Sequence, residues 1–319
     1  MAAIRSAFCS NGGNSEMTMT ASALKERSLL GLKELSSSEI GSILDRAAYW
    51  ESRTEKVVPV LKDRFVANMF FENSTRTRFS FEMAEKRLGA EVLNFSAAVS
   101  SVEKGESIHD TVRTLESMGI DAGVIRLKPV GLLADLATKV SMPLINAGDG
   151  NNEHPTQALL DLYTMKKHFG ELKGLKVSII GDIKHSRVAR SNLWALQKFG
   201  AEVKLCAPEI MQAPELGSYA PYVSMDEALC ADVVMMLRVQ LERHAEGLLR
   251  SAEQYRLEYG LTEERAALLA PHVIIMHPAP INRNVEIDDA VVEHPQSRIF
   301  KQMSNGVPIR MAVVERAMK

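Results

Sequence analysis

One short segment concentrates side chains suited to binding an anion. Residues 74–78, Ser-Thr-Arg-Thr-Arg, place three hydroxyls and two guanidiniums directly after the apolar run 65–71 and directly before a helical pattern. The first N–H groups of a helix lack partners within the helix and carry a partial positive charge. An arginine fork also matches the oxygens of a phosphate. The segment therefore predicts a phosphate site without a P-loop glycine pattern, whereas a shorter Ser/Thr-Arg pair would indicate only a helix cap and a solvated arginine.

Strands and helices alternate along the chain in an order that can hold such a loop. Short apolar runs with helical patterns between them predict buried parallel strands. These runs occupy residues 65–71, 91–95, 122–127 and 143–146, and again residues 176–181, 202–206, 232–237 and 272–277. The sequence therefore predicts an α/β fold with two doubly wound parallel sheets joined by helices, in which ligands bind at the carboxyl ends of the strands.

The length of 319 residues favours two domains. We predict a first domain over residues 22–155 and a second over 156–296, which begins with a linking helix over 155–169. The C-terminal helix, placed at about residues 297–319 and at the least over about 306–318, is expected to pack back on the first domain.

The N-terminal residues differ in composition from the rest of the chain. Residues 1–16 lack the apolar segment of a signal peptide. With the residues up to 21 they are expected to form a flexible extension, and Met17 or Met19 is an alternative start. A first helix is predicted after Ser36, because Ser36 and Glu39 have the spacing of a capping box. Its buried face is expected to comprise Ile40, Ile43, Leu44, Ala47 and Ala48.

Composition narrows the class of protein. With 38 Lys and Arg against 40 Asp and Glu, the net charge of −2 provides no long-range attraction to nucleic acid or anionic lipid. Apolar residues make up 46% of the chain, but no apolar run approaches the roughly 20 residues of a membrane span. Three widely spaced cysteines form no CxxC pair, which favours a reducing, cytoplasmic environment.

The segment 70–82, FFENSTRTRFSFE, resembles the carbamoyl-phosphate signature of the aspartate and ornithine carbamoyltransferases, and the likeness extends from about residue 25 to the C-terminus. The resemblance implies that Ser74, Thr75, Arg76 and Thr77 hold the phosphate. It also implies that Arg126, after the third strand, reaches both the phosphate and the carbonyl oxygen. His154 and Gln157, in the motif HPTQ at the start of the linking helix, resemble the pair that binds the carbonyl group in this family.

The polar segment 100–106 would ordinarily be a solvated connection. In the family such a loop reaches into the active site of the neighbouring subunit, and Ser100 and Lys104 match its serine and lysine. The resemblance therefore implies a homotrimer with active sites shared between subunits. It leaves open whether separate regulatory chains or a dihydroorotase associate with the trimer.

The second domain must select the amino acid that accepts the carbamoyl group. Aspartate brings two carboxylates, which call for guanidinium forks, whereas ornithine brings an extended amine. Arg187, Arg238 and Gln240 lie after strands at positions that bind aspartate in the family, with Lys104 as a further aspartate ligand. Residues 277–280, His-Pro-Ala-Pro, replace the His-Cys-Leu-Pro of ornithine-specific relatives. These features favour aspartate over ornithine or another amine.

Two further roles follow from the resemblance. The backbone carbonyls of Pro278 and Ala279 would accept hydrogen bonds from the attacking amine. Glu72, Arg187 and Arg243 resemble an ion-pair set that holds the two domains together around bound substrates.

The expected activity is transfer of the carbamoyl group of carbamoyl phosphate to L-aspartate, an early step of pyrimidine biosynthesis. Catalysis is assigned to Arg76, Thr77, Lys104, Arg126, His154 and Gln157. Neither a metal nor an organic cofactor is implied, since His109, His168, His185 and His272 have unrelated spacings. The alternatives are an ornithine enzyme, a silent structural subunit lacking some of these residues, and a nucleotide-binding module. The absence of GxGxxG after the strand at 176–181 opposes the last of these.

Overall fold

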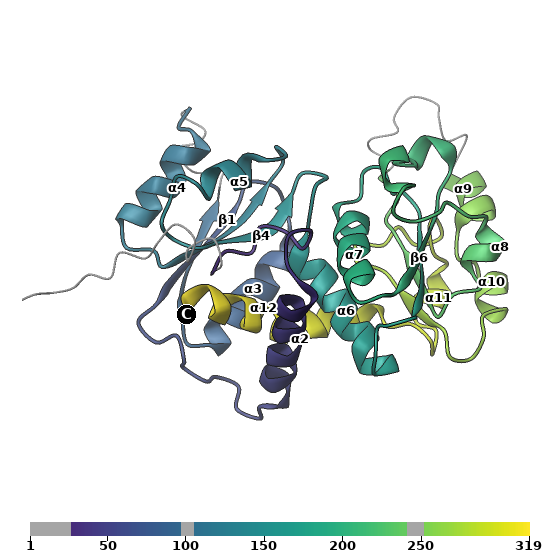
Figure 1. Ribbon diagram of the computed structural model, residues 1–319, viewed down its shortest axis with the longest axis horizontal. Coiled ribbons are helices and arrows are strands. Elements are labelled where there is room, and N and C mark those ends of the chain that lie inside the picture. Colours follow the sequence, from purple (N-terminus) through teal and green to yellow (C-terminus); the bar gives the residue numbers. More distant parts are fainter. Residues whose placement is uncertain (1–26, 97–104, 241–251) are drawn as a thin grey trace, which may run out of the picture.

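The computed structural model describes residues 27–96, 105–240 and 252–319 (Figure 1). Its eight described strands form two four-stranded parallel sheets, one with the order β2-β1-β3-β4 and the other with the order β6-β5-β7-β8. The predicted α/β fold with two doubly wound sheets is confirmed.

The strands lie close to the predicted apolar runs. The first sheet contains β1 (Phe65–Phe70), β2 (Glu91–Ser96), β3 (Ala122–Leu127) and β4 (Leu144–Asp149). The second sheet contains β5 (Lys176–Ile180), β6 (Glu202–Cys206), β7 (Val233–Met236) and β8 (Ile274–Met276).

Helices connect the strands and cover the sheets. Those associated with the first sheet are α2 (Ser37–Ser52), α3 (Thr75–Arg87), α4 (Ile108–Ser117), α5 (Leu132–Leu136) and α6 (Pro155–Phe169). Those that follow are α7 (Arg187–Lys198), the 3₁₀ helices η3 (Glu209–Met211) and η4 (Pro214–Leu216), α8 (Met225–Ala228), α9 (Ala252–Tyr259), α10 (Glu263–Ala267), α11 (Asp289–Val292) and α12 (Ile299–Met318).

Helix α2 begins with the predicted capping box. The Ser36 hydroxyl accepts from the Glu39 N–H at 3.2 Å, and the Glu39 carboxylate accepts from the Ser36 N–H at 2.8 Å. Ile40, Ile43, Leu44 and Ala47 are buried as predicted, but Ala48 is exposed and Trp50 is buried in its place. Trp50 continues the stripe from Ala47 by three positions, and its indole N–H donates to buried Glu315 of α12 at 2.9 Å.

The last helix, α12, matches the wider predicted range of about 297–319. It begins at Ile299, seven residues before the narrower range of about 306–318, and contains Pro308 in its interior. Gly306 and Pro308 each disfavour a helix, because proline removes a helical N–H and glycine weakens a helix. Tertiary packing outweighs both effects here, since α12 packs along α2, α3 and α6 (Figure 1). Its buried stripe already includes Ile299, Gln302 and Asn305.

Strand order explains where ligands can bind. In each sheet the chain places its second strand on one side of the first and its third strand on the other side. The order of strands thus reverses between β1 and β3 and again between β5 and β7. Crevices at the carboxyl ends of parallel strands open at such points. Within the described residues no helix is long and apolar enough to cross a membrane.

Candidate active site

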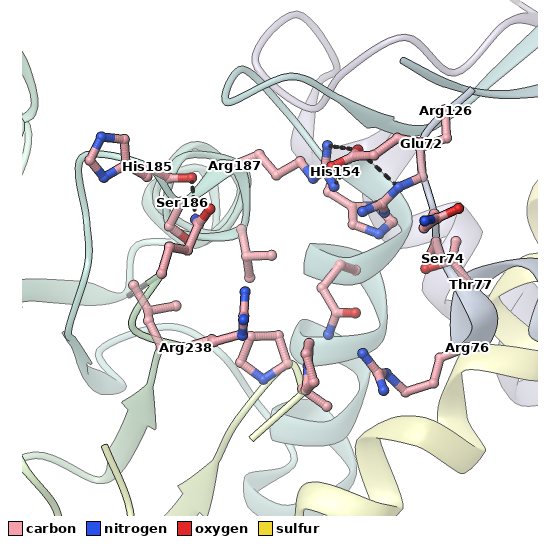
Figure 2. Close-up of a pocket in the computed structure, with 18 of the residues that line it drawn as sticks. Glu72, Ser74, Arg76, Thr77, Arg126, His154, His185, Ser186, Arg187 and Arg238 are labelled. Atoms are coloured by element: carbon pink, nitrogen blue, oxygen red, sulfur yellow. Dashed lines mark hydrogen bonds and ion pairs between the residues drawn. The ribbon is translucent and has the colours of Figure 1, made fainter. Parts of the chain in front are cut away.

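A pocket of about 460 Å³ is lined by residues at the ends of strands of both sheets and in the loops that follow them (Figure 2). It is lined from both sheets by predicted site residues, namely Glu72, Ser74, Thr75, Arg76, Thr77, Arg126, His154, Gln157, Arg187, Arg238, Gln240, Pro278 and Ala279. Ser100, Lys104 and Arg243, which were also predicted, lie outside the described residues.

The phosphate loop has the predicted strand-loop-helix form. It follows β1 and leads into α3, whose N-cap is Ser74. The Ser74 side chain makes no capping hydrogen bond to the helix. The first turn of α3 therefore keeps N–H groups available for an anion in the pocket. Thr77 is buried in that turn, whereas Arg76 is exposed at the rim of the pocket.

Glu72 organises two of the arginines. Its Oε2 lies 3.1 Å from Nε of Arg126, at the end of β3, and 3.0 Å from Nη2 of Arg187, at the start of α7 (Figure 2). The Glu72–Arg187 pair therefore joins residues that follow strands of different sheets. Burial lowers the pKa of Arg126 to about 10, with the neighbouring Arg187 contributing in the same direction. Arg126 thus remains cationic at neutral pH.

Gly148 provides the space in which Arg126 and Arg187 meet. It has a φ of +128°, which disfavours other residues. A Cβ at this position would lie 2.9 Å from Cζ of Arg187 and 3.1 Å from Nη1 of Arg126. Gly148 is therefore required both by its backbone conformation and by the close approach of two guanidiniums.

His154 is the N-cap of α6, but its side chain makes no capping bond. It is 5% exposed, and its Nδ1 is buried without a hydrogen-bond partner. Burial lowers the pKa of His154 well below its ordinary value, and Arg187, Arg126 and Arg310 lower it further. The imidazole is therefore neutral at physiological pH and carries a single N–H.

The second half of the pocket comes from loops that follow β5, β7 and β8. Gln240 donates from Nε2 to the His185 carbonyl at 3.0 Å, which ties the loop after β7 to the loop after β5. Pro278 and Ala279 follow β8, and Ala279 has a left-handed φ of +56°. A non-glycine residue in this conformation is uncommon and marks a constrained backbone.

The pocket is strongly cationic. Four guanidiniums line it, those of Arg76, Arg126, Arg187 and Arg238, and among its described lining residues Glu72 alone carries a carboxylate. The pKa of Arg76 is lowered, first by burial and then by the positive charge of Arg238 on the opposite side (Figure 2). Such a site is suited to binding two small anions next to each other. Within the described residues no group of three or more His, Cys, Asp or Glu side chains is arranged to hold a metal ion.

Sequence reasoning missed some residues of the pocket. His185 and Ser186 line it beside Arg187, and the segment GDIKHSRVARS gave a signal for them through its position after β5. The sequence likewise predicted no role for Asp161, Gln302 or Glu286. They are buried behind lining residues. Asp161 lies only four positions after Gln157, but no local pattern pairs it with Gln302 or pairs Glu286 with Val239.

The fold and the site define a two-domain α/β protein with an anion-binding pocket between its sheets. Comparison with known proteins identifies its relatives. Residues 27–167 match the carbamoyl-P binding domain of the aspartate/ornithine carbamoyltransferases, and residues 173–316 match the Asp/Orn binding domain. The chain belongs to the aspartate/ornithine carbamoyltransferase family.

Solved structures of the family have the same fold. Aspartate transcarbamoylase of Trypanosoma cruzi in complex with carbamoyl aspartate and phosphate is 31% identical, with a TM-score of 0.81 over 92% of this chain and 96% of that chain. Another structure of that enzyme, in complex with N-(phosphonacetyl)-L-aspartic acid, is 31% identical, with a TM-score of 0.80 over 95% and 98%. The catalytic subunit of M. jannaschii aspartate transcarbamoylase is 35% identical, with a TM-score of 0.81 over 92% and 97%.

Proposed function

We propose that this enzyme transfers the carbamoyl group of carbamoyl phosphate to the amine of L-aspartate, giving N-carbamoyl-L-aspartate and phosphate, an early step of pyrimidine biosynthesis. The observation that carries the proposal is the cationic pocket, in which a helix N-terminus on one side faces Arg238 on the other. The structures of similar enzymes with carbamoyl phosphate, with aspartate and with carbamoyl aspartate support it.

The first domain, residues 22–155, is assigned to carbamoyl phosphate. Ser74, Thr75, Arg76 and Thr77 bind the phosphate at the N-terminus of α3. Arg126, His154 and Thr77 all donate hydrogen bonds to the carbonyl oxygen. Because neutral His154 donates without adding charge and Arg126 remains cationic, the site stabilises the oxyanion of a tetrahedral intermediate.

The second domain, residues 156–296, is assigned to aspartate, whose carboxylates bind Arg187, Arg238 and Gln240. The carbonyls of Pro278 and Ala279 accept from its neutral amine. The amine nitrogen forms a bond to the carbamoyl carbon, the bond from that carbon to the phosphate oxygen breaks, and phosphate takes up the amine proton. Much of the rate enhancement comes from holding two anions in contact within a cationic pocket.

The Glu72–Arg187 ion pair is assigned to domain closure, together with Arg243. Carbamoyl phosphate binds first, since its loop belongs to a preformed helix terminus. Ser100 and Lys104 act from the neighbouring subunit of a homotrimer. The family resemblance supports this assembly, and the exposed rim at Arg76 leaves room for a side chain from another subunit.

The test is product formation from carbamoyl phosphate with L-aspartate and with L-ornithine in parallel. Ureido product with aspartate alone supports the proposal, and product with ornithine alone overturns the roles of Arg187 and Arg238. For the assembly, inactive Arg76→Ala and Lys104→Ala trimers are mixed, dissociated and reassociated. Recovery of activity supports shared sites, whereas continued inactivity of reassociated trimers contradicts them.

A further inference from the structure

A series of buried and partly buried hydrogen bonds runs behind the pocket and links its two halves. On the carbamoyl side, Gln157 donates from Nε2 to Oδ1 of Asp161 at 2.9 Å. The same oxygen accepts from Nε2 of Gln302, on α12, at 2.8 Å. Asn192 of α7 donates to the other oxygen of Asp161 at 2.8 Å. Asp161 and Gln302 are 0% and 1% exposed, so solvent cannot replace these contacts.

The orientation of the Gln302 amide follows from its partners. Its Oε1 accepts from the backbone N–H of His277 at 2.9 Å. A backbone N–H can only donate, so the oxygen must face His277 and the amide nitrogen must face the Asp161 carboxylate. Gln302 therefore bridges a residue behind the carbamoyl site and the residue that immediately precedes Pro278.

His277 in turn holds the backbone of the segment that contains Pro278 and Ala279. Its Nδ1 accepts from the Ala279 N–H at 2.8 Å, and its Nε2 lies 3.3 Å from Oε1 of Glu286. Because Nδ1 is an acceptor, Nε2 carries the proton and donates to the carboxylate. This bond to Ala279 helps hold its left-handed backbone, in which the proposed amine-binding carbonyl lies.

Glu286 extends the connection to the aspartate side. Its carboxylate accepts from the Asn282 N–H at 2.5 Å and from the Val239 N–H at 3.5 Å. Val239 stands between Arg238 and Gln240, the two proposed aspartate ligands of this loop. The hydrogen bonds thus lead from Gln157 on one side to the loop of Arg238 on the other.

We propose that Gln302 is a positioning residue that couples binding of carbamoyl phosphate to binding of the acceptor. It fixes the amide of Gln157 through Asp161 and fixes the Pro278–Ala279 segment through His277. The planar amide of Gln302 bonds to Asp161 through its nitrogen and to His277 through its oxygen. A displacement of either half therefore changes the geometry of the other. Buried polar groups are costly when a partner is lost, so the bridge resists independent movement of the halves.

The inference rests on the proposed function but is tested by binding rather than by turnover. Succinate, which is aspartate without its amine, serves as an unreactive acceptor probe. Its Kd is measured with and without saturating carbamoyl phosphate for the full-length enzyme and for Gln302→Met, a change that keeps the length of the side chain but removes both hydrogen bonds. The ratio of the two Kd values is the coupling, which in proteins is typically about 5–150-fold.

Asn305 provides a matched control on the same helix. It is 3% exposed and donates to Oγ1 of Thr164 on α6 at 2.8 Å, but it does not line the pocket. Asn305→Leu therefore perturbs the packing of α12 on α6 without breaking the bridge. We expect Gln302→Met to reduce the ratio of Kd values at least about fivefold, and Asn305→Leu to leave it unchanged.

Wild-type coupling in Gln302→Met, or an equal loss in Asn305→Leu, would overturn the inference. If Gln302→Met fails to fold, as judged by thermal unfolding, Gln302→Asn is measured instead. This variant keeps an amide that is one methylene too short to reach both Asp161 and His277. A wild-type enzyme that forms no product with either amino acid contradicts the proposed function instead, so the two failures are distinguishable.

Discussion

The two halves of the pocket are built on sheets with the same strand order, but their substrate-binding side chains differ in exposure and in the elements that carry them. In the first half, Thr77, His154 and Gln157 are 8%, 5% and 8% exposed and lie at the starts of long helices, and Arg76 alone of the assigned catalytic side chains described there is exposed. In the second half, Arg238 and Gln240 are only partly buried and lie on a loop after β7. Equivalent topology thus supports one site built largely on helix starts and one that depends on connections between loops.

This difference fits the order of binding proposed above. A helix terminus presents its N–H groups whether or not a ligand is bound, so the phosphate half needs little rearrangement. The acceptor half depends on long arginine side chains and on buried groups behind them. Variants in the first half should therefore impair the reaction most, and variants in the second half should mainly weaken binding of the acceptor.

The largest effect is expected for Arg76→Ala. Loss of one preorganised donor to developing charge typically costs about 10²–10³-fold in rate, and Arg76 is exposed, so the fold should be unaffected. The measurement is kcat at saturating concentrations of both substrates. Arg78→Ala, a change in the same helical turn at a residue that does not line the pocket, is the control and should retain activity. Near-wild-type turnover of Arg76→Ala would refute the assigned phosphate site.

A smaller but still severe loss is expected for Gly148→Ala. Gly148 lies where Arg126 of the first half approaches Arg187 of the second half. The new methyl group would displace the guanidiniums of Arg126 and Arg187. Displacements of about 1 Å in a positioned site can cost roughly 10²-fold in rate. The measurement is kcat/KM for aspartate.

Gly119→Ala separates crowding from backbone strain. Gly119 also has a positive φ, of +94°, but a Cβ there would meet nothing within 4 Å. If Gly119→Ala and Gly148→Ala lose activity equally, backbone strain rather than contact with the arginines is the cause.

Arg238→Gln should distinguish the halves most directly. A hydrogen bond to a charged group contributes about 1.5–3 kcal/mol, so KM for aspartate should rise roughly 10–100-fold. The Kd of carbamoyl phosphate alone should remain within about twofold, because its proposed ligands lie on the first half. Initial rates against aspartate and equilibrium binding of carbamoyl phosphate measure the two effects. An equal loss in both would show that the halves are not separable.

Sequence alone located both sheets and most of the pocket, because the informative residues are consecutive. The phosphate loop, HPTQ and HPAP are each contained within a few positions, and each follows a strand whose apolar run is recognisable. Tertiary packing outweighs local preference in two helices. Helix α12 continues from Ile299 through Gly306 and Pro308, and α2 buries Trp50 rather than the predicted Ala48.

The residues behind the pocket were not predictable for a different reason. Asp161 meets Gln302 across 141 positions, and Gln302 meets His277 across 25. Each is an ordinary polar residue in its local sequence, and only the packing of α12 against α6 and the end of β8 gives it a partner. Their hydrogen bonds are a product of the assembled fold, whereas the motif residues reflect local strand-loop-helix geometry.

The smallest effect on catalysis is expected at Glu85, a buried carboxyl of the first half that does not line the pocket. Glu85 is 0% exposed, and its Oε2 accepts from Nδ2 of Asn68 on β1 at 2.8 Å. Its Oε1 and the Oδ1 of Asn68 are both buried without a partner. A proton on Glu85 would satisfy both atoms by converting the pair into a cyclic acid–amide contact. Burial accordingly raises the pKa of Glu85 to about 8.

This raised pKa predicts the sign of a pH effect on stability. In the unfolded chain Glu85 titrates near 4.5, so the protonated form stabilises the fold fully below that pH. The contribution is lost as pH rises towards 8. The amide introduced by Glu85→Gln reproduces the neutral acid and donates to Asn68 at every pH. The variant should match the wild type near pH 4.5 and become more stable than it at higher pH, by up to about 1.4 kcal/mol per pH unit.

Denaturant unfolding of both proteins between pH 5 and pH 8 measures this difference, with kcat recorded in parallel. Glu82→Gln, on the same helix, is the control with the opposite sign. Lys86 holds the pKa of Glu82 below its usual value, so removing that charge should weaken the fold slightly at pH 8. A stability difference between Glu85→Gln and the wild type that is independent of pH would show that Glu85 is ionised in the folded protein. A change in kcat would show that the core beneath α3 is not independent of the phosphate site, and the contrast between a first half built on helix starts and a second half that depends on connections between loops would then fail.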